Sequence, residues 1–243
     1  MRIGIIGTGT IASAVVRGIA QDGHRITVSE RSAGNAAALA AEFENVHVAP
    51  NQGVLDASEV VFLGLMAEVA ADILGQLRFR PEHRVITLMA GRSLSEVGKL
   101  VEPALAEAIM MPFPGVADGG SPIMMQGNAA LVREIFGARN PVFELESPAE
   151  MEAYLCAQAV LSPVTRMVED AARWLGARVS DAEQGERFLR ALVASSLQAS
   201  ACAPLIQALN TPGGYNQRLR QHMEQSGMGQ ALSQGLDKLE SGR

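Results

Sequence analysis

The feature that most constrains the fold is a glycine turn close to the amino terminus. An apolar segment, Arg2–Ile6, precedes the turn, and an amphipathic stretch, Ile11–Gln21, follows it. A strand, a glycine turn and a helix in this order form the context in which G-x-G-x-x-G/A predicts a dinucleotide site. The residues of the predicted pyrophosphate loop are Gly7-Thr8-Gly9-Thr10-Ile11-Ala12.

Each small residue of this loop has a distinct physical role. Gly7 permits the tight turn, Gly9 removes the side chain that would block a pyrophosphate, and Ala12 lets the helix pack close to the strand. The phosphates would then bind free N–H groups at the positive end of the helix. The alternative is a tight turn that binds nothing.

Length and composition favour an α/β enzyme and argue against several other classes. The 243 residues can bury a large core, arranged as one or two domains. The net charge of −6 is spread along the chain without a basic block, so nucleic-acid binding is not expected. No apolar run reaches the roughly 18–20 residues that a membrane span requires. The chain begins with a core strand, so we expect no signal peptide and a cytoplasmic location.

The two cysteines, Cys156 and Cys202, lie in helical patterns without the spacing of metal ligands. We expect reduced thiols near a core and no metal site.

The first part of the chain, residues 1–146, alternates apolar strands with helical patterns. Continuous apolar strands separated by helices indicate a parallel sheet covered on both faces, here a doubly wound Rossmann domain. The predicted helices are Ile11–Gln21, Asn35–Glu44, Glu68–Leu77 and one opened by the capping box Ser93–Glu96. The predicted strands are Arg2–Ile6, Arg25–Ser29, Val46–Ala49, Val60–Leu65, Arg84–Leu88, Ala108–Met111, Ile123–Gln126 and Val142–Leu145.

The remainder, residues 147–243, contains helical patterns only. Ser147-Pro148-Ala149-Glu150 combines an N-cap, a proline at the first helical position and an N3 glutamate. The predicted helices are Met151–Leu175, Asp181–Leu209, Tyr215–Ser226 and Gln230–Glu240, with Gly227 ending the third. Because such helices leave a long apolar face uncovered, we expect an all-α dimerisation domain that forms a homodimer or a higher oligomer.

Cofactor preference should be set at the end of the second strand. Glu30 lies where a carboxylate can bind a ribose diol, which favours NAD. Arg31 and Ser32 follow at once and would suit the 2′-phosphate of NADP. The two signals oppose each other, and a solvated surface pair is the alternative for Glu30 and Arg31.

Two further segments carry prolines and glycines at unusual density. Met110–Gly120 follows a strand and would line a nicotinamide or form a structural turn. Asn210–Asn216 lies between two helices, and its glycine N–H groups would bind a small carboxylate or form an ordinary turn.

These segments, in this order, resemble pyrroline-5-carboxylate reductase over nearly the whole chain. Met89-Ala90-Gly91 approximates the family's Ala-Ala-Gly stretch, and Met111–Pro114 matches part of its Met-Pro-Asn-Thr-Pro loop. The most specific match is Thr211-Pro212-Gly213-Gly214-Tyr215-Asn216, which corresponds to Ser-Pro-Gly-Gly-Thr-Thr. The resemblance implies hydride transfer from NADPH to a cyclic imine, which makes proline. It places Leu65, Met66, Met111 and Pro112 at the cofactor, and Thr211, Gly213, Gly214 and Asn216 at the substrate.

The departures from the family pattern concern the expected active site. The family's Asn-Thr is reduced to Phe113, its Thr-Thr becomes Tyr215-Asn216, and Ala157–Pro163 lacks the glycines of Ser-Gly-Ser-Gly-Pro. Imine reduction needs little from a protein acid, so no catalytic residue is assigned, and the four histidines are expected to be structural or surface groups. The expected activity is an NAD(P)H-dependent reductase of pyrroline-5-carboxylate or a related imine or carbonyl. The alternative is a catalytically inactive dinucleotide-binding homologue that acts as a sensor or partner protein.

Overall fold

The computed structural model describes residues 1–242. The contacts between residues divide the chain into two compact units. The first unit is Met1–Met151, and the second begins at Glu152. The predicted domain boundary after residue 146 lies just before helix α7 (Pro148–Ala157). In the structure, the boundary between the two units falls within that helix, after Met151.

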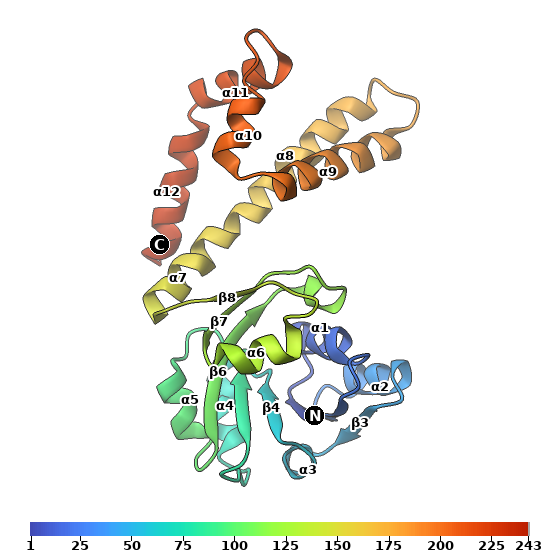
Figure 1. Cartoon of the computed structure of the whole chain (residues 1–243), viewed down its shortest axis with the longest axis vertical. Helices are drawn as coiled ribbons and strands as arrows, with labels where there is room; N and C mark the ends of the chain where they lie inside the picture. Colours follow the sequence, from blue (N-terminus) through green and yellow to red (C-terminus); the bar gives the residue numbers. More distant parts are fainter. Residues whose placement is uncertain (243) are drawn as a thin grey trace. The chain divides into compact units, whose positions relative to one another are not determined.

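The first unit is built on one eight-stranded sheet in the order β3-β2-β1-β4-β5-β6-β7-β8 (Figure 1). Strands β1 to β6 run parallel, which confirms the predicted Rossmann sheet. Strand β7 pairs antiparallel with β6, and β8 runs parallel to β7. The strands are β1 (Arg2–Ile6), β2 (Arg25–Ser29), β3 (Val46–Ala49), β4 (Val60–Leu63), β5 (Arg84–Thr87), β6 (Leu105–Pro112), β7 (Ile123–Gly127) and β8 (Val142–Glu144).

The reversal at β7 follows from the length of its connection. Only residues 113–122 join β6 to β7, and they hold the single short helix η1 (Pro114–Ala117). A parallel return requires a crossover of a dozen or more residues, so this segment can only lead back antiparallel.

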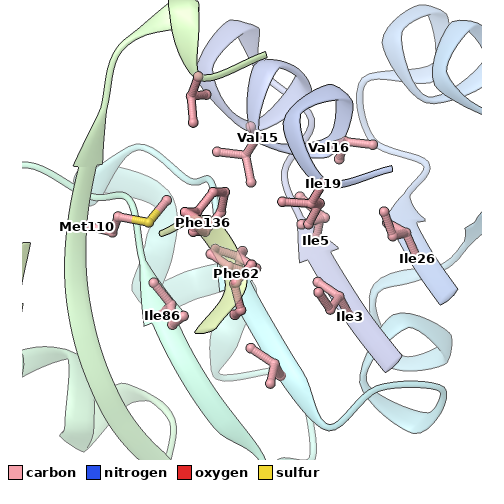
Figure 2. Close-up of a cluster of buried hydrophobic side chains, with 14 of the residues drawn as sticks. Ile3, Ile5, Val15, Val16, Ile19, Ile26, Phe62, Ile86, Met110 and Phe136 are labelled. Atoms are coloured by element: carbon pink, nitrogen blue, oxygen red, sulfur yellow. The ribbon is translucent and has the colours of Figure 1, made fainter. Parts of the chain in front are cut away.

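Helices cover both faces of the sheet and bury two apolar clusters. One cluster joins α1 and α6 to the sheet, and within it Phe62 and Phe136 meet edge to face with ring centroids 6.0 Å apart (Figure 2). The other joins α3, α4 and α5 to the opposite face. The helices are α1 (Thr10–Ile19), α2 (Ala33–Glu42), α3 (Asn51–Asp56), α4 (Ala67–Leu74), α5 (Leu94–Leu100) and α6 (Ala129–Phe136).

Helices α3 and α6 are present in the structure but were not predicted from the sequence. The six residues of α3 are too few to show a helical period. Helix α6 does carry a signal, because Leu131, Val132, Ile135 and Phe136 are buried at helical spacing after the N-cap Asn128.

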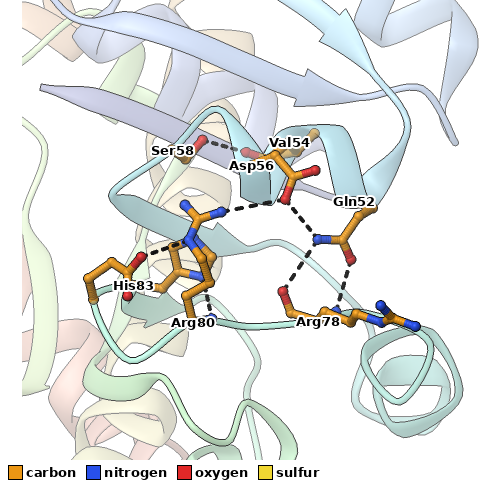
Figure 3. Close-up of polar contacts among 8 residues, drawn as sticks. Gln52, Val54, Asp56, Ser58, Arg78, Arg80 and His83 are labelled. Carbon is orange, nitrogen blue, oxygen red and sulfur yellow. Dashed lines mark hydrogen bonds and ion pairs between the residues drawn. The ribbon is translucent and has the colours of Figure 1, made fainter.

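A polar network ties the loop before β5 to α3 (Figure 3). Arg80 pairs with Glu82 at 2.8 Å and with Asp56 at 3.5 Å. The Arg80 backbone N–H donates to Nδ1 of His83, whose side chain is buried. Burial lowers the pKa of His83, and the charge of Arg80 adds to this effect.

The second unit contains helices only, as predicted, but two of the predicted helices are divided. The first becomes α7, η2 (Gln158–Val160) and α8 (Leu161–Gly176), and the second becomes α9 (Ala182–Ala199) and α10 (Cys202–Ala208). Pro163 and Pro204 explain both divisions, because each lacks an N–H for the carbonyl four residues earlier and its ring clashes there. Helices α11 (Tyr215–Gln225) and α12 (Met228–Glu240) follow, and Gly227 between them has a φ of +88°.

Small residues let α8 and α9 pack closely. A Cβ on Gly176 would lie 3.0 Å from Cβ of Ala182, and one on Gly185 would lie 3.0 Å from a methyl carbon of Leu175. Many large apolar side chains of the second unit nevertheless remain exposed, including Leu161, Trp174, Phe188, Leu192, Leu197 and Leu219.

Within residues 1–242, no single helix has the length and apolar composition to cross a membrane. The bent pair α9 and α10, at 119°, meets these two criteria together.

Candidate functional site

The predicted cofactor residues lie at one edge of the sheet. The glycine turn follows β1, Glu30 to Ser32 follow β2, Leu65 and Met66 follow β4, and Met111 and Pro112 end β6. All four strands run parallel, so these segments share the carboxyl edge. The chain leaves β1 for β2 on one side and later returns to β4 on the other. Ligands of open α/β sheets bind at such a switch point.

Gly7 makes the turn possible because its φ is +91°, and an added Cβ would strike the Gly64 carbonyl oxygen. Gly64 is equally restricted, since its Cβ would lie 2.6 Å from the Gly7 carbonyl oxygen and 2.8 Å from Cβ of Ala12. Gly64 therefore supports the turn from β4. The loop pattern in the sequence does not predict this role, because Gly64 follows a different strand.

Gly9 has the opposite environment, because a Cβ there would meet no atom within 4 Å. Gly9 is the N-cap of α1 and supplies no capping side chain. No residue among 1–242 accepts a hydrogen bond from the N–H of Gly9 or Thr10. The start of α1 thus offers free donors beside an open space.

Two side chains from neighbouring elements fix the backbone of the turn. The Gly7 N–H donates to Oγ of buried Ser29 at 2.8 Å, and Nδ2 of Asn35 donates to the Thr8 carbonyl at 2.6 Å. Neither Ser29 nor Asn35 is predicted by the loop pattern, which covers only consecutive residues. Ser29 reaches the turn because β2 pairs with β1, and Asn35 reaches it from the first turn of α2.

Thr8 is fully buried, and its Oγ1 has no hydrogen-bond partner among the described residues. Buried polar atoms without a partner are rare and call for an explanation, such as a ligand. With the open space at Gly9 and the free donors of α1, the turn fits a pyrophosphate group.

The residues predicted at the ribose are accessible. Glu30 and Arg31 are exposed, and Ser32 is half-buried at the N-cap of α2. The Ser32 hydroxyl makes no capping bond to α2, so it is available to a ligand. The site therefore presents a carboxylate that suits a free ribose diol beside a guanidinium and a hydroxyl that suit a 2′-phosphate.

The Pro- and Gly-rich segment after β6 is anchored to α1. A Cβ on Gly18 would lie 2.5 Å from the Val116 carbonyl oxygen. Arg139 bridges the two elements, because its Nη1 donates to the Gly18 carbonyl at 2.9 Å and its Nη2 donates to the Asp118 carbonyl at 3.2 Å. These contacts hold the part of the segment beyond Phe113 against α1. Met111 is half-buried at the carboxyl edge and Met66 is 72% exposed, so both can contact a ligand there.

The turn predicted at the substrate lies in the second unit, before α11. The Gly213 N–H donates to Oε1 of Gln217 at 2.8 Å, and the Gly214 N–H donates to the Thr211 carbonyl at 2.9 Å. The expectation that both glycine N–H groups are free to bind a carboxylate is therefore wrong. Thr211 and Asn216 remain exposed and keep their polar side chains available.

No group of three or more His, Cys, Asp or Glu side chains in residues 1–242 is placed to hold a metal ion.

Part of the chain matches a known protein family in sequence. Residues 2–91 match the family described as NADP oxidoreductase coenzyme F420-dependent. No curated protein sequence matches the chain significantly.

Several solved structures share the fold. A pyrroline-5-carboxylate reductase from Streptococcus pyogenes is 23% identical, with a TM-score of 0.81 over 99% of this chain and 98% of that one. A pyrroline carboxylate reductase from Plasmodium falciparum with NADP bound is 13% identical, with a TM-score of 0.81 over 99% and 96%. An imine reductase from Pseudomonas sp. is 18% identical, with a TM-score of 0.61 over 82% and 74%. The chain thus has the fold of the pyrroline-5-carboxylate reductases over 99% of its residues, as the sequence motifs predict.

Proposed function

We propose that this protein is an NAD(P)H-dependent reductase of C=N bonds. Its substrate would be 1-pyrroline-5-carboxylate, giving L-proline, or a related imine or carbonyl compound. The observation that carries the proposal is the glycine turn Gly7–Ala12, which has open space at Gly9 and a buried Thr8 hydroxyl without a hydrogen-bond partner among the described residues. The similar structures support the reaction class, since they include two pyrroline carboxylate reductases and an imine reductase.

The residues of the chain would bind and orient the reactants. The N–H groups of Gly9 and Thr10 would bind the phosphates, Glu30, Arg31 and Ser32 would contact the adenosine ribose, and Leu65, Met66, Met111 and Pro112 would border the nicotinamide. A bound reduced nicotinamide supplies hydride. Thr211 and Asn216 would border the substrate through their side chains, and Gly213 and Gly214 would form the backbone of the turn that carries them. Because a protonated iminium already accepts hydride, orientation is the main requirement.

Cofactor oxidation by the purified protein tests the proposal. NADPH and NADH are each titrated by calorimetry, and the preferred one is then assayed with pyrroline-5-carboxylate and a panel of cyclic imines and ketones. Substrate-dependent oxidation of the cofactor is expected. Absence of oxidation with every compound would contradict the reductase assignment.

The second candidate is a dinucleotide-binding homologue without catalysis, which senses the cofactor or binds a partner. Replacement of the family's Asn-Thr by Phe113 and of its Thr-Thr by Tyr215-Asn216 favours it. Tight cofactor binding with no turnover would support this candidate, and measurable hydride transfer would exclude it.

We also propose that the second unit forms a homodimer. A groove of about 1030 Å³ between α8 and α9 is lined by apolar side chains such as Leu161, Val168 and Leu197. Arg187, Arg190, Glu169 and Glu186 border it, so its rim can pair with its own copy. Exposed apolar surface of this kind marks an interaction site.

A further inference from the structure

We propose that Asn35 is a positioning residue, which orients the Thr8–Gly9 peptide so that the Gly9 N–H points to the pyrophosphate. The inference rests on the proposed dinucleotide binding and assigns a role to a residue outside the glycine motif. Asn35 belongs to the first turn of α2, 27 residues beyond Thr8.

The hydrogen bond between Asn35 and Thr8 is short. Nδ2 of Asn35 lies 2.6 Å from the Thr8 carbonyl oxygen, and Oγ of Ser13 lies 3.5 Å from the same oxygen. Asn35 is therefore the stronger of the two donors that hold this carbonyl. The Thr8 hydroxyl does not fix the orientation of this peptide, because its Oγ1 has no hydrogen-bond partner among the described residues.

The orientation of the carbonyl determines that of the next N–H. The peptide between Thr8 and Gly9 is trans and planar, so its C=O and N–H point in opposite directions. With the carbonyl held toward α2, the Gly9 N–H points away from α2. The space at Gly9 is open, and no described residue accepts this N–H.

The same contact links two parts of the predicted cofactor site. Asn35 follows Ser32 closely on α2, so the helix that begins at the ribose segment also holds the phosphate loop. Glycine loops have many accessible conformations, and a fixed peptide plane lowers the entropic cost of binding. Removal of Asn35 should therefore weaken pyrophosphate binding without removing a ligand contact.

Asn45 provides a matched control for this test. Its Nδ2 also donates to backbone carbonyls, those of Ala20 and His24, both at 2.7 Å. These carbonyls lie outside the glycine turn. Asn45→Ala thus removes the same chemical group, together with two hydrogen bonds to backbone carbonyls, at a site that does not hold the Thr8–Gly9 peptide.

The first measurement uses the ligand-free protein. Amide signals of ¹⁵N-labelled wild type, Asn35→Ala and Asn45→Ala are compared by NMR. In Asn35→Ala the Gly9 amide should shift and show faster backbone motion, whereas in Asn45→Ala it should match the wild type. An unchanged Gly9 amide in Asn35→Ala would overturn the inference, whether or not the protein binds a dinucleotide.

The second measurement uses two probes, ADP-ribose, which contains the pyrophosphate, and adenosine, which does not. Asn35→Ala should weaken ADP-ribose binding about tenfold and leave adenosine binding within about twofold, and Asn45→Ala should change neither. Equal losses for both probes would mean that Asn35 contacts the adenosine, which overturns the positioning role. If the wild type binds neither probe, the proposed dinucleotide site fails, while the Gly9 amide still decides whether Asn35 orients the loop.

Discussion

Gly7 and Gly64 face each other across the ends of β1 and β4, and neither position has room for a Cβ. A Cβ on Gly64 would lie 2.6 Å from the Gly7 carbonyl oxygen, and a Cβ on Gly7 would strike the Gly64 carbonyl oxygen in turn. The glycine turn therefore depends on a partner that follows another strand.

Gly64→Ala should destabilise the protein, because the added methyl group would lie against backbone that cannot withdraw easily. Overpacking of this kind costs about 1–3 kcal/mol of unfolding free energy. Chemical denaturation measures the effect. Gly34→Ala is the control, since a Cβ at Gly34 meets nothing within 4 Å and alanine favours the helix. Equal stability of Gly64→Ala and wild type would contradict the tight contact.

Gly9→Ala should separate binding from stability. Gly9 has a φ of −73° and a ψ of −176°, which alanine adopts without strain, and a Cβ there meets no protein atom. The unfolding free energy should stay equal or rise by about 0.4–1 kcal/mol. NADPH affinity should fall at least about tenfold, because the methyl group would occupy the space for the pyrophosphate. Unchanged affinity by calorimetry would mean that the phosphates bind elsewhere.

Substitutions at Glu30 and Arg31 test the ribose assignment. Glu30→Ala should raise the affinity for NADPH relative to NADH, since a carboxylate repels a 2′-phosphate. Arg31→Ala should lower the ratio of NADPH affinity to NADH affinity by at most about tenfold, because a charged hydrogen bond at an exposed position contributes about 1 kcal/mol. Both ratios come from calorimetric titrations. If neither substitution moves the ratio, the segment does not contact the ribose.

His83 should make stability depend on pH. Burial, followed by the charge of Arg80, lowers its pKa in the folded state. Well above about pH 6.5, His83 is neutral in both the folded and the unfolded state, and its protonation does not reduce stability. Below this pH, His83 is protonated in the unfolded state before it is protonated in the folded state, so the free energy of unfolding falls. His83→Asn keeps an acceptor for the Arg80 N–H but does not titrate.

The decline in unfolding free energy from pH 7 to pH 5 should therefore be smaller in His83→Asn than in wild type. Denaturation at both pH values measures it, with His47→Asn, an exposed histidine on β3, as control. His24, whose pKa is also lowered, by burial and then by the Met1 amine, is present in all three proteins. An equal decline in His83→Asn and wild type would refute the role of His83.

The proposed homodimer can be tested at Leu197, which is 51% exposed in the groove between α8 and α9. Light scattering should give a dimer mass for the wild type and a monomer mass for Leu197→Glu, because a charge in an apolar interface is costly. Leu105→Glu is the control, since Leu105 is 59% exposed in the first unit. A monomeric wild type would contradict the proposal.

The sequence alone was sufficient for the Rossmann sheet, because apolar β-type segments such as Val60–Leu63 alternate with helical patterns over residues 1–146. The glycine turn could also be predicted from the sequence, because its strand, turn and helix are consecutive. The divisions at Pro163 and Pro204 were readable in principle, because proline excludes the hydrogen bond and the space of a continuous helix. Gly227 at the end of α11 follows from local chemistry as well.

Only the tertiary structure determined which residues far apart in the sequence contact one another at the site. Ser29, Asn35 and Gly64 hold the glycine turn from β2, α2 and β4, and no sequence spacing encodes these contacts. The engagement of the Gly213 N–H by Gln217 likewise depends on how the turn folds onto α11. A sequence pattern shows which groups are present, whereas their hydrogen-bond partners, and hence which donors stay free for a ligand, depend on packing in three dimensions.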